Sequence, residues 1–210
     1  MSLSHKARFS LSSRTEDIRN VADQIIEDES KLDEYLEDIQ GDSRIKRQKS
    51  AAVVAEVARR NKDLVVPHTQ IFVDALDYPE AQTRWEVLDI LAMICEDDSR
   101  TAEKGLVGAE DALFDEDSGP LRLSAMRFLC RIGRTTEKRS QKVWPLINEA
   151  IQCYHGDVEY NDMLLALIDF SEGKLAKDVK KEFIARMSFD AENSKGTLCK
   201  RSTIIVQNLK

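Results

Sequence analysis

Apolar residues recur at helical spacing along the chain, and the clearest example is the stretch Trp85–Ile94. Counting from Arg84, apolar residues follow three, seven and ten positions later. They are Val87, Leu91 and Ile94. Residues at this spacing lie on one face of an α-helix. The stretch therefore predicts an amphipathic helix that buries one side.

The same spacing returns at a nearly constant distance along the chain. The residues that begin the five copies are Arg47, Arg84, Arg122, Asn161 and Cys199. Each of them follows the previous one after nearly the same length of chain. Self-similarity at a fixed period is typical of stacked repeats, in which each unit buries its apolar face against its neighbours. The period therefore predicts a solenoid.

A shorter apolar helix is expected before each of these helices, so that each repeat is a helix–turn–helix unit. The linkers inside the units contain Gly, Asp, Ser or Pro, which favour turns and helix caps. Pro67 and Pro145 are expected in the first turns of two of the first helices, where a missing amide costs little. The predicted repeats cover residues 30–59, 66–96, 103–134, 142–172 and 175–210.

The N-terminal region has a different pattern. Residues 13–16 (Ser-Arg-Thr-Glu) fit a capping box, in which two side chains satisfy free amides at a helix start. We therefore expect a capping helix over 13–28, which covers the first repeat. Residues 1–12 show no period and are expected to be a flexible tail. Residues 13–210 would then form a single domain.

The period, the paired helices, and a turn with Asp or Pro followed by Arg resemble HEAT and armadillo-type repeats. The resemblance covers Lys31–Lys210. It implies an all-α, right-handed α-α superhelix of about five HEAT-like helix pairs. In HEAT repeats an Arg at this place often joins a ladder with acidic residues of neighbouring turns, and we expect this of Arg47, Arg84 and Arg122. The alternative architecture is a non-repetitive helical bundle.

Composition agrees with helices and limits the chemistry. The chain is 42% apolar and 33% charged, with 8 Gly and 4 Pro. Its four cysteines are dispersed, which favours buried thiols in a cytoplasmic protein over disulfides or a metal site. The three histidines are isolated, and Gly-rich phosphate loops and Gly-x-Ser-x-Gly motifs are missing. We expect no cofactor, no metal and no catalytic residue. Every apolar run is far shorter than a membrane-spanning helix requires, so no membrane span is expected.

Charge is distributed in blocks that follow the repeats. The net charge of −7 disfavours nonspecific binding of the whole molecule to nucleic acid. Residues 44–62 carry seven bases and one acid, residues 74–117 fourteen acids and three bases, and residues 122–142 seven bases and one acid. A banded surface suits a protein with complementary bands better than uniformly negative DNA. The best local anion site is a basic strip formed by Arg127, Arg131, Arg134, Lys138 and Arg139. Cations also favour a helix C-terminus, which is the structural alternative for the strip.

One group of polar residues lies away from the core face of the second helices. Trp85 and Asp89 are four residues apart on one helix, and Arg127 occupies the place of Asp89 in the next repeat. Because stacked repeats place like positions side by side, we expect Asp89 beside Arg127 on the concave surface. Trp and Arg often anchor interfaces. The sequence therefore predicts a binding site formed by Trp85, Asp89, Arg127, Arg131 and Arg134. The alternative is an inter-repeat salt bridge with an aromatic lid.

These residues also resemble a second family, the alkylpurine DNA glycosylases built of HEAT-like repeats. That family carries Trp, three residues, then Asp on one helix, and a functional Arg in a neighbouring repeat. The resemblance implies that Asp89 helps to cleave the glycosidic bond of a cationic modified base, with Trp85 contacting the lesion. We expect first a non-enzymatic scaffold that binds a protein or peptide. The alternative is a DNA-binding or DNA-repair protein of the glycosylase type, with or without activity.

Overall fold

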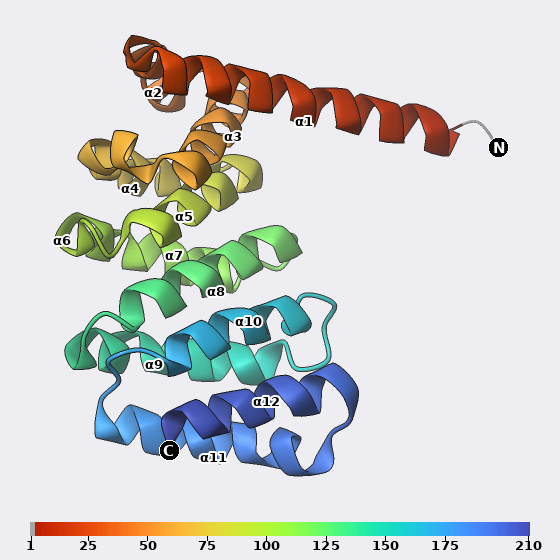
Figure 1. The fold of residues 1–210 in the computed structure, drawn as a ribbon, viewed down its shortest axis with the longest axis vertical. Coiled ribbons are helices and arrows are strands. Elements are labelled where there is room, and N and C mark those ends of the chain that lie inside the picture. Colours follow the sequence, from red (N-terminus) through yellow and green to blue (C-terminus); the bar gives the residue numbers. More distant parts are fainter. Residues whose placement is uncertain (1–2) are drawn as a thin grey trace.

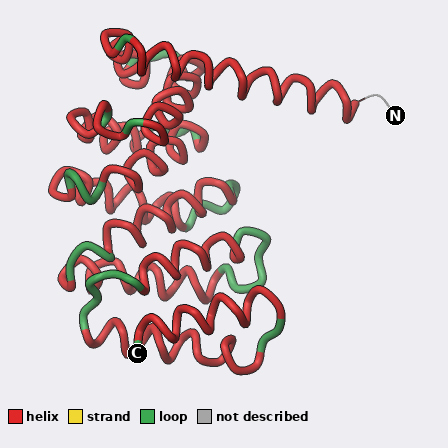
Figure 2. Tube along the Cα trace, in the orientation of Figure 1, coloured by secondary structure: helices red, strands yellow, loops and turns green. Residues whose placement is uncertain are grey.

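The chain folds into a stack of paired α-helices (Figure 1). The computed structural model describes the backbone of residues 3–210 and the side chains of residues 15–210. This part of the chain consists of helices and loops and has no strand (Figure 2). The helices are α1 Leu3–Glu27, α2 Leu32–Gln40, α3 Arg44–Arg60, α4 Thr69–Asp74, α5 Ala81–Ile94, α6 Ser99–Ala102, α7 Leu106–Leu113, α8 Gly119–Gly133, α9 Glu137–Cys153, α10 Tyr160–Ser171, α11 Lys177–Asn193 and α12 Gly196–Leu209.

In chain order the helices after α1 form five units, α2/α3, α4/α5, α7/α8, α9/α10 and α11/α12, and α6 is a single turn before α7. The second helix of each unit packs on that of the next, so that α3, α5, α8, α10 and α12 form a continuous layer. We call it the second-helix layer. The stack of helix pairs that the period predicts is confirmed. No described helix has both the length and the apolarity needed to cross a membrane.

Helix α1 packs on α3 and covers the first unit, as expected of a capping helix. Ala22 and Ile25 are its buried contacts with the core. The helix begins at Leu3, whereas the capping box predicted its start at Ser13 and a flexible tail before it. Residues 3–12 contain no Gly or Pro, so nothing in them stops a helix from extending. Met1 and Ser2 lie outside the described residues.

Helix α9 differs most from the expected boundaries. It begins at Glu137, where the Thr136 hydroxyl accepts a bond of 3.2 Å from the Arg139 amide. Pro145 therefore lies inside the helix, and its expected place in a first turn is wrong. The signal for the true start was the Thr at the cap, which is a preferred capping residue. Val143 and Trp144 are buried beside Pro145, and their packing offsets the missing backbone bond.

The first repeat arginine, Arg47, joins the first unit to the second. Its buried guanidinium pairs with the Glu80 carboxylate at the start of α5 and lies 4.3 Å from the centroid of the Tyr78 ring. The Tyr78 hydroxyl donates to the Gln40 carbonyl at the end of α2, at 3.2 Å. Charge pairing and cation–π contact thus act on one guanidinium. The predicted arginine–acid ladder is confirmed at this boundary.

The same arrangement recurs between the third and fourth units. Arg122 pairs with Glu159 at 3.1 Å and lies 5.1 Å from the centroid of the Tyr154 ring. The Tyr154 hydroxyl donates to the Leu113 carbonyl at the end of α7, at 2.7 Å. The ladder is therefore confirmed here as well.

Arg84, between these two boundaries, bonds to a backbone carbonyl and departs from the predicted ladder. Its Nη2 donates to the Gly108 carbonyl at 3.3 Å. The helix start that follows carries Ser118, where the other two boundaries carry glutamate. Gly108 is required here, because a Cβ on it would stand 2.7 Å from Leu76 Cβ.

The four cysteines are free and differ in burial, which predicts their reactivity. Cys95 and Cys130 are buried, and Cys153 is exposed. Burial raises the pKa of the Cys95 thiol to about 12 and that of Cys130 well above its usual value. Because the thiolate is the reactive form, we expect a thiol reagent at pH 8 to label Cys153 first. A mass-spectrometric time course should show Cys95 and Cys130 labelled only as the chain unfolds. Labelling of Cys130 as fast as Cys153 would contradict this.

Candidate functional site

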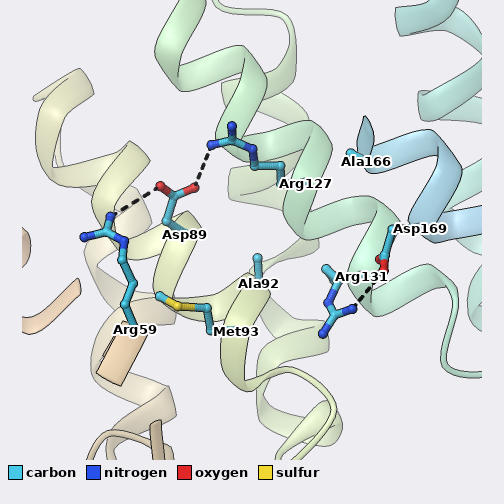
Figure 3. A pocket seen from close by; sticks show the side chains of 8 residues that line it. All are labelled: Arg59, Asp89, Ala92, Met93, Arg127, Arg131, Ala166 and Asp169. Carbon is cyan, nitrogen blue, oxygen red and sulfur yellow. Dashed lines mark hydrogen bonds and ion pairs between the residues drawn. The ribbon is translucent and has the colours of Figure 1, made fainter. Parts of the chain in front are cut away.

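A pocket of about 410 Å³ lies on the second-helix layer (Figure 3). Four consecutive second helices contribute its lining, which is Arg59 from α3, Asp89, Ala92 and Met93 from α5, Arg127 and Arg131 from α8, and Ala166 and Asp169 from α10. Stacked repeats bring equivalent helix faces side by side, which explains why residues so far apart in sequence share one pocket.

The pocket combines an apolar base with charged walls. Ala92 and Met93 lie at the centre of the view, between Arg59 on one side and Arg131 on the other (Figure 3). Ala92 and Ala166 are buried, so their methyl groups belong to the core as much as to the pocket. An apolar surface edged by charges is suited to a side chain that has an apolar stem and a polar end.

Asp89 lies between two arginines. Arg127 Nη1 is 3.7 Å from Asp89 Oδ1, and Arg59 Nη2 is 3.9 Å from Asp89 Oδ2. The predicted position of Asp89 beside Arg127 is confirmed. Both separations are longer than hydrogen bonds, so these are loose ion pairs. Arg59 was not predicted, because it lies in the last turn of α3, outside the offsets that locate Asp89 and Arg127 in their repeats.

Arg131 and Arg134 share one carboxylate on the neighbouring helix. Arg131 Nη1 lies 3.0 Å from Asp169 Oδ1, and Arg134 bonds to the same oxygen. Arg131 lines the pocket, whereas Arg134 reaches it only through Asp169. Asp169 was missed by the repeat alignment. A single carboxylate in the otherwise apolar run 163–170 is the signal that could have found it.

The basic strip is neutralised by carboxylates along most of its length. Arg127, Arg131 and Arg134 are paired as described, and Arg139 Nε bonds to Glu103 Oε2 at 3.0 Å. Hydrogen bonds from Lys142 and Arg139 lower the pKa of Glu103, with Lys142 contributing most. The structural alternative placed the strip at a helix C-terminus, whereas Lys138 and Arg139 lie in the first turn of α9.

Trp85 stands apart from the pocket. It is half-buried, packs against the core, and does not line the pocket. The pocket begins one turn later on α5, at Asp89, and extends towards Met93. The predicted cluster is therefore assembled as the Asp89–Arg127 pair with Arg131, without Trp85. The resemblance to the glycosylases implied one site for Trp85, Asp89 and Arg127, and the pocket holds two of these three residues.

The Asp89–Arg127 pair should contribute little to stability. The Arg127 side chain is 44% exposed, so water and salt screen its attraction to Asp89. We expect Arg127→Ala to change the free energy of unfolding by less than about 1 kcal/mol, measured by urea denaturation. Lys142→Ala, which removes another exposed cation, is the matched control. A loss several times larger than that of the control would show that the pair supports the stack.

Comparison with known proteins shows the fold. No protein-family model matches the chain, and no curated protein sequence is similar to it. A designed armadillo repeat protein in complex with the peptide (KR)4 has a TM-score of 0.74 at 12% identity, over 100% of this chain and 95% of its own. Computationally designed armadillo repeat proteins for modular peptide recognition give 0.72 at 13% identity, over 94% and 92%. An engineered protein gives 0.74 at 17% identity, over 92% and 89%. The chain is thus an all-α solenoid of the armadillo/HEAT type.

Proposed function

We propose that this protein is a non-enzymatic scaffold that binds a protein or peptide segment. Its binding site is the pocket of the second-helix layer, with Asp89, Arg127 and Arg131 in contact with the partner. The observation that carries the proposal is the pocket itself, in which four neighbouring helices surround an apolar base with charges. Complementary charges give specificity, and arginines often anchor interfaces.

The dimensions suit an extended chain. Neighbouring helix axes are about 8–10 Å apart, so a surface from α3 to α10 spans about 25–30 Å. An extended peptide rises about 3.3 Å per residue, so about eight residues would cross it. Two of the structures of similar fold are of proteins made for, or in complex with, peptides, which supports this class of partner.

The other predicted residues have supporting places in this proposal. Arg134 is a positioning residue, because it holds the Asp169 carboxylate that Arg131 also contacts. Trp85 lies one turn before Asp89 on α5, to the side of the partner's path from α3 to α10, where a partner with a bulky side chain would contact it. A cytoplasmic location is part of the proposal and rests on the four free thiols, which reducing compartments preserve.

Selection from a random peptide display library tests the proposal. We expect wild-type protein to enrich a consensus sequence, and the charge-swapped variant Asp89→Arg/Arg127→Asp to lose it. The swap keeps an ion pair between α5 and α8, so the fold should be preserved while recognition changes. The matched control swaps Lys46 and Asp38, an ion pair of the first unit that does not line the pocket. Failure to enrich any consensus, or the same consensus from the Asp89/Arg127 swap, would refute the proposal.

A titration with DNA separates peptide binding from nucleic-acid binding. Duplexes that contain an alkylated base or an abasic site are titrated at 50 and 200 mM salt. For a scaffold of net charge −7 we expect no binding of either duplex. Tight binding that falls steeply with salt would favour the DNA-repair alternative instead.

A further inference from the structure

We infer that the partner is an acidic peptide segment that carries apolar residues a few positions from its carboxylates. This inference rests on the proposed function and specifies its partner. It follows from three features of the second-helix layer. They are the greater exposure of the lining arginines compared with the lining aspartates, the unused donors of Arg127, and an apolar surface that adjoins the pocket.

Among the residues that line the pocket, the arginines are more exposed than the aspartates. The side chains of Arg59, Arg127 and Arg131 are 45%, 44% and 35% exposed. Those of Asp89 and Asp169 are 22% and 29% exposed. The lining has three arginines and two aspartates, hence one net positive charge in a chain of net charge −7. Arg59 also pairs with Glu56 and Glu86. Arg131 also pairs with Glu96, whose side chain is 46% exposed. Arg127 is therefore the arginine of the lining with the fewest carboxylate partners among the described residues, and it is the one that a ligand can engage.

Arg127 can donate hydrogen bonds to a carboxylate of the partner without giving up one that it already makes. A guanidinium has five N–H donors in a planar fork that matches a carboxylate. The separation of 3.7 Å between Arg127 and Asp89 is an ion pair beyond hydrogen-bond length. Arg131 lies one turn further along α8 and faces the same pocket. A glutamate or aspartate of the partner can thus bind Arg127 through two parallel bonds, with Arg131 beside it.

An apolar surface continues from the pocket towards α12. Leu165 lies one turn before Asp169 on the same face of α10, and it is 49% exposed. Ile204 of α12 is 42% exposed. Two hydrogen bonds between α10 and α12 bracket these residues, one from Arg201 to the carbonyl of Asn161 and one from the side chain of Asn208 to that of Ser171. Leu165 and Ile204 therefore lie at the same level of neighbouring helices.

The spacing of the two surfaces fixes the expected motif. The apolar surface formed by Leu165 and Ile204 lies midway between α10 and α12. Its distance from α8, which carries Arg127, is about one and a half helix spacings, or about 14 Å. An extended chain covers this distance in about four residues. The partner should therefore carry one or two acidic residues and, about four positions away, one or two apolar ones.

Fluorescence anisotropy with three labelled peptides tests the inference. The first peptide carries two glutamates, three glycines and two leucines in that order. The second replaces the glutamates with lysines, and the third replaces the leucines with serines. We expect the first to bind about tenfold more tightly than either of the others, which corresponds to the loss of one good contact. Its affinity should fall between 50 and 200 mM salt, because charges contribute to it.

Matched variants locate the two contacts. Arg127→Glu should weaken binding of the first peptide about tenfold or more, whereas Lys142→Glu, the same charge change on another exposed cation, should leave it unchanged. Ile204→Ser should weaken binding of the first peptide, which carries the leucines, and should not weaken binding of the third, in which serines replace them. Circular dichroism verifies that all three variants are folded.

Three outcomes would overturn the inference. Tighter binding of the lysine peptide, or insensitivity to Arg127→Glu, would show a partner of different chemistry while the scaffold function stands. No binding of any of the three peptides would also refute the acidic motif. The display selection then decides the function separately, since a different consensus would retain it and no consensus would refute both.

Discussion

Replacing Glu80 with alanine is expected to lower the free energy of unfolding by about 3–5 kcal/mol. The side chains of Arg47 and Glu80 are 9% and 2% exposed, so the substitution leaves a guanidinium buried beside Tyr78 without its counter-charge. Removing one partner of a buried pair costs far more than the pair itself contributes, because the remaining charge is not solvated. Urea denaturation followed by circular dichroism measures the loss.

Two further variants distinguish this cause from general damage. Asp23→Ala removes an exposed carboxylate that pairs with Arg60, and it should cost less than about 1 kcal/mol. The double replacement Arg47→Met/Glu80→Leu removes both charges and should recover much of the loss. An effect of Glu80→Ala no larger than that of Asp23→Ala would show that water reaches Arg47 and that the first boundary is not held by this pair.

Phe183→Ala should have a similar effect at the other end of the stack, about 3–5 kcal/mol. Phe183 is fully buried, and its ring centroid lies 5.0 Å from that of Trp144 and 5.7 Å from that of Phe170. The three rings join α9, α10 and α11. Because each stacked unit contacts only its nearest neighbours and the fifth unit has one neighbour, the loss should fall on the fifth unit. Hydrogen exchange should accelerate in residues 177–209 and remain unchanged in α2–α5.

Phe189→Ala is the matched control on the same helix. The Phe189 side chain is 70% exposed, and its removal should change stability by no more than about 0.5 kcal/mol. Equal acceleration of exchange throughout the chain after Phe183→Ala would contradict the prediction. It would mean that all five units unfold as one cooperative body.

The sequence predicts the stack and the central pair of the pocket for the same reason. Asp89 and Arg127 lie one full repeat period apart along the chain, so stacking brings them together. Arg59 and Asp89 are separated by less than one period, and their contact depends on how α3 is rotated against α5. A repeat alignment carries no information on that rotation. Asp169 was missed for the related reason that its position in the repeat is held by Ala92 and Cys130 in the preceding units.

The extent of the pocket was less predictable than its centre. Trp85 and Asp89 share a helix face, yet a face runs the length of α5 and the pocket occupies only its second half. Where the pocket ends depends on the side chains of neighbouring helices. The helix starts at Leu3 and Glu137 were missed for a local reason, because the residues before the expected boundaries are compatible with both helix and loop.

The contacts between neighbouring units join residues that are close in sequence, and this has a consequence for folding during translation. The Arg47–Glu80 pair joins residues 33 positions apart, and the Tyr154–Leu113 bond joins residues 41 apart. Each unit therefore finds its partners within about forty residues of chain, and contacts so close in sequence form quickly. A nascent chain that has left the ribosome as far as Ile94 already contains both sides of the first Arg–Tyr–Glu contact. The solenoid can thus assemble from its N-terminal end while the C-terminal units are still being translated.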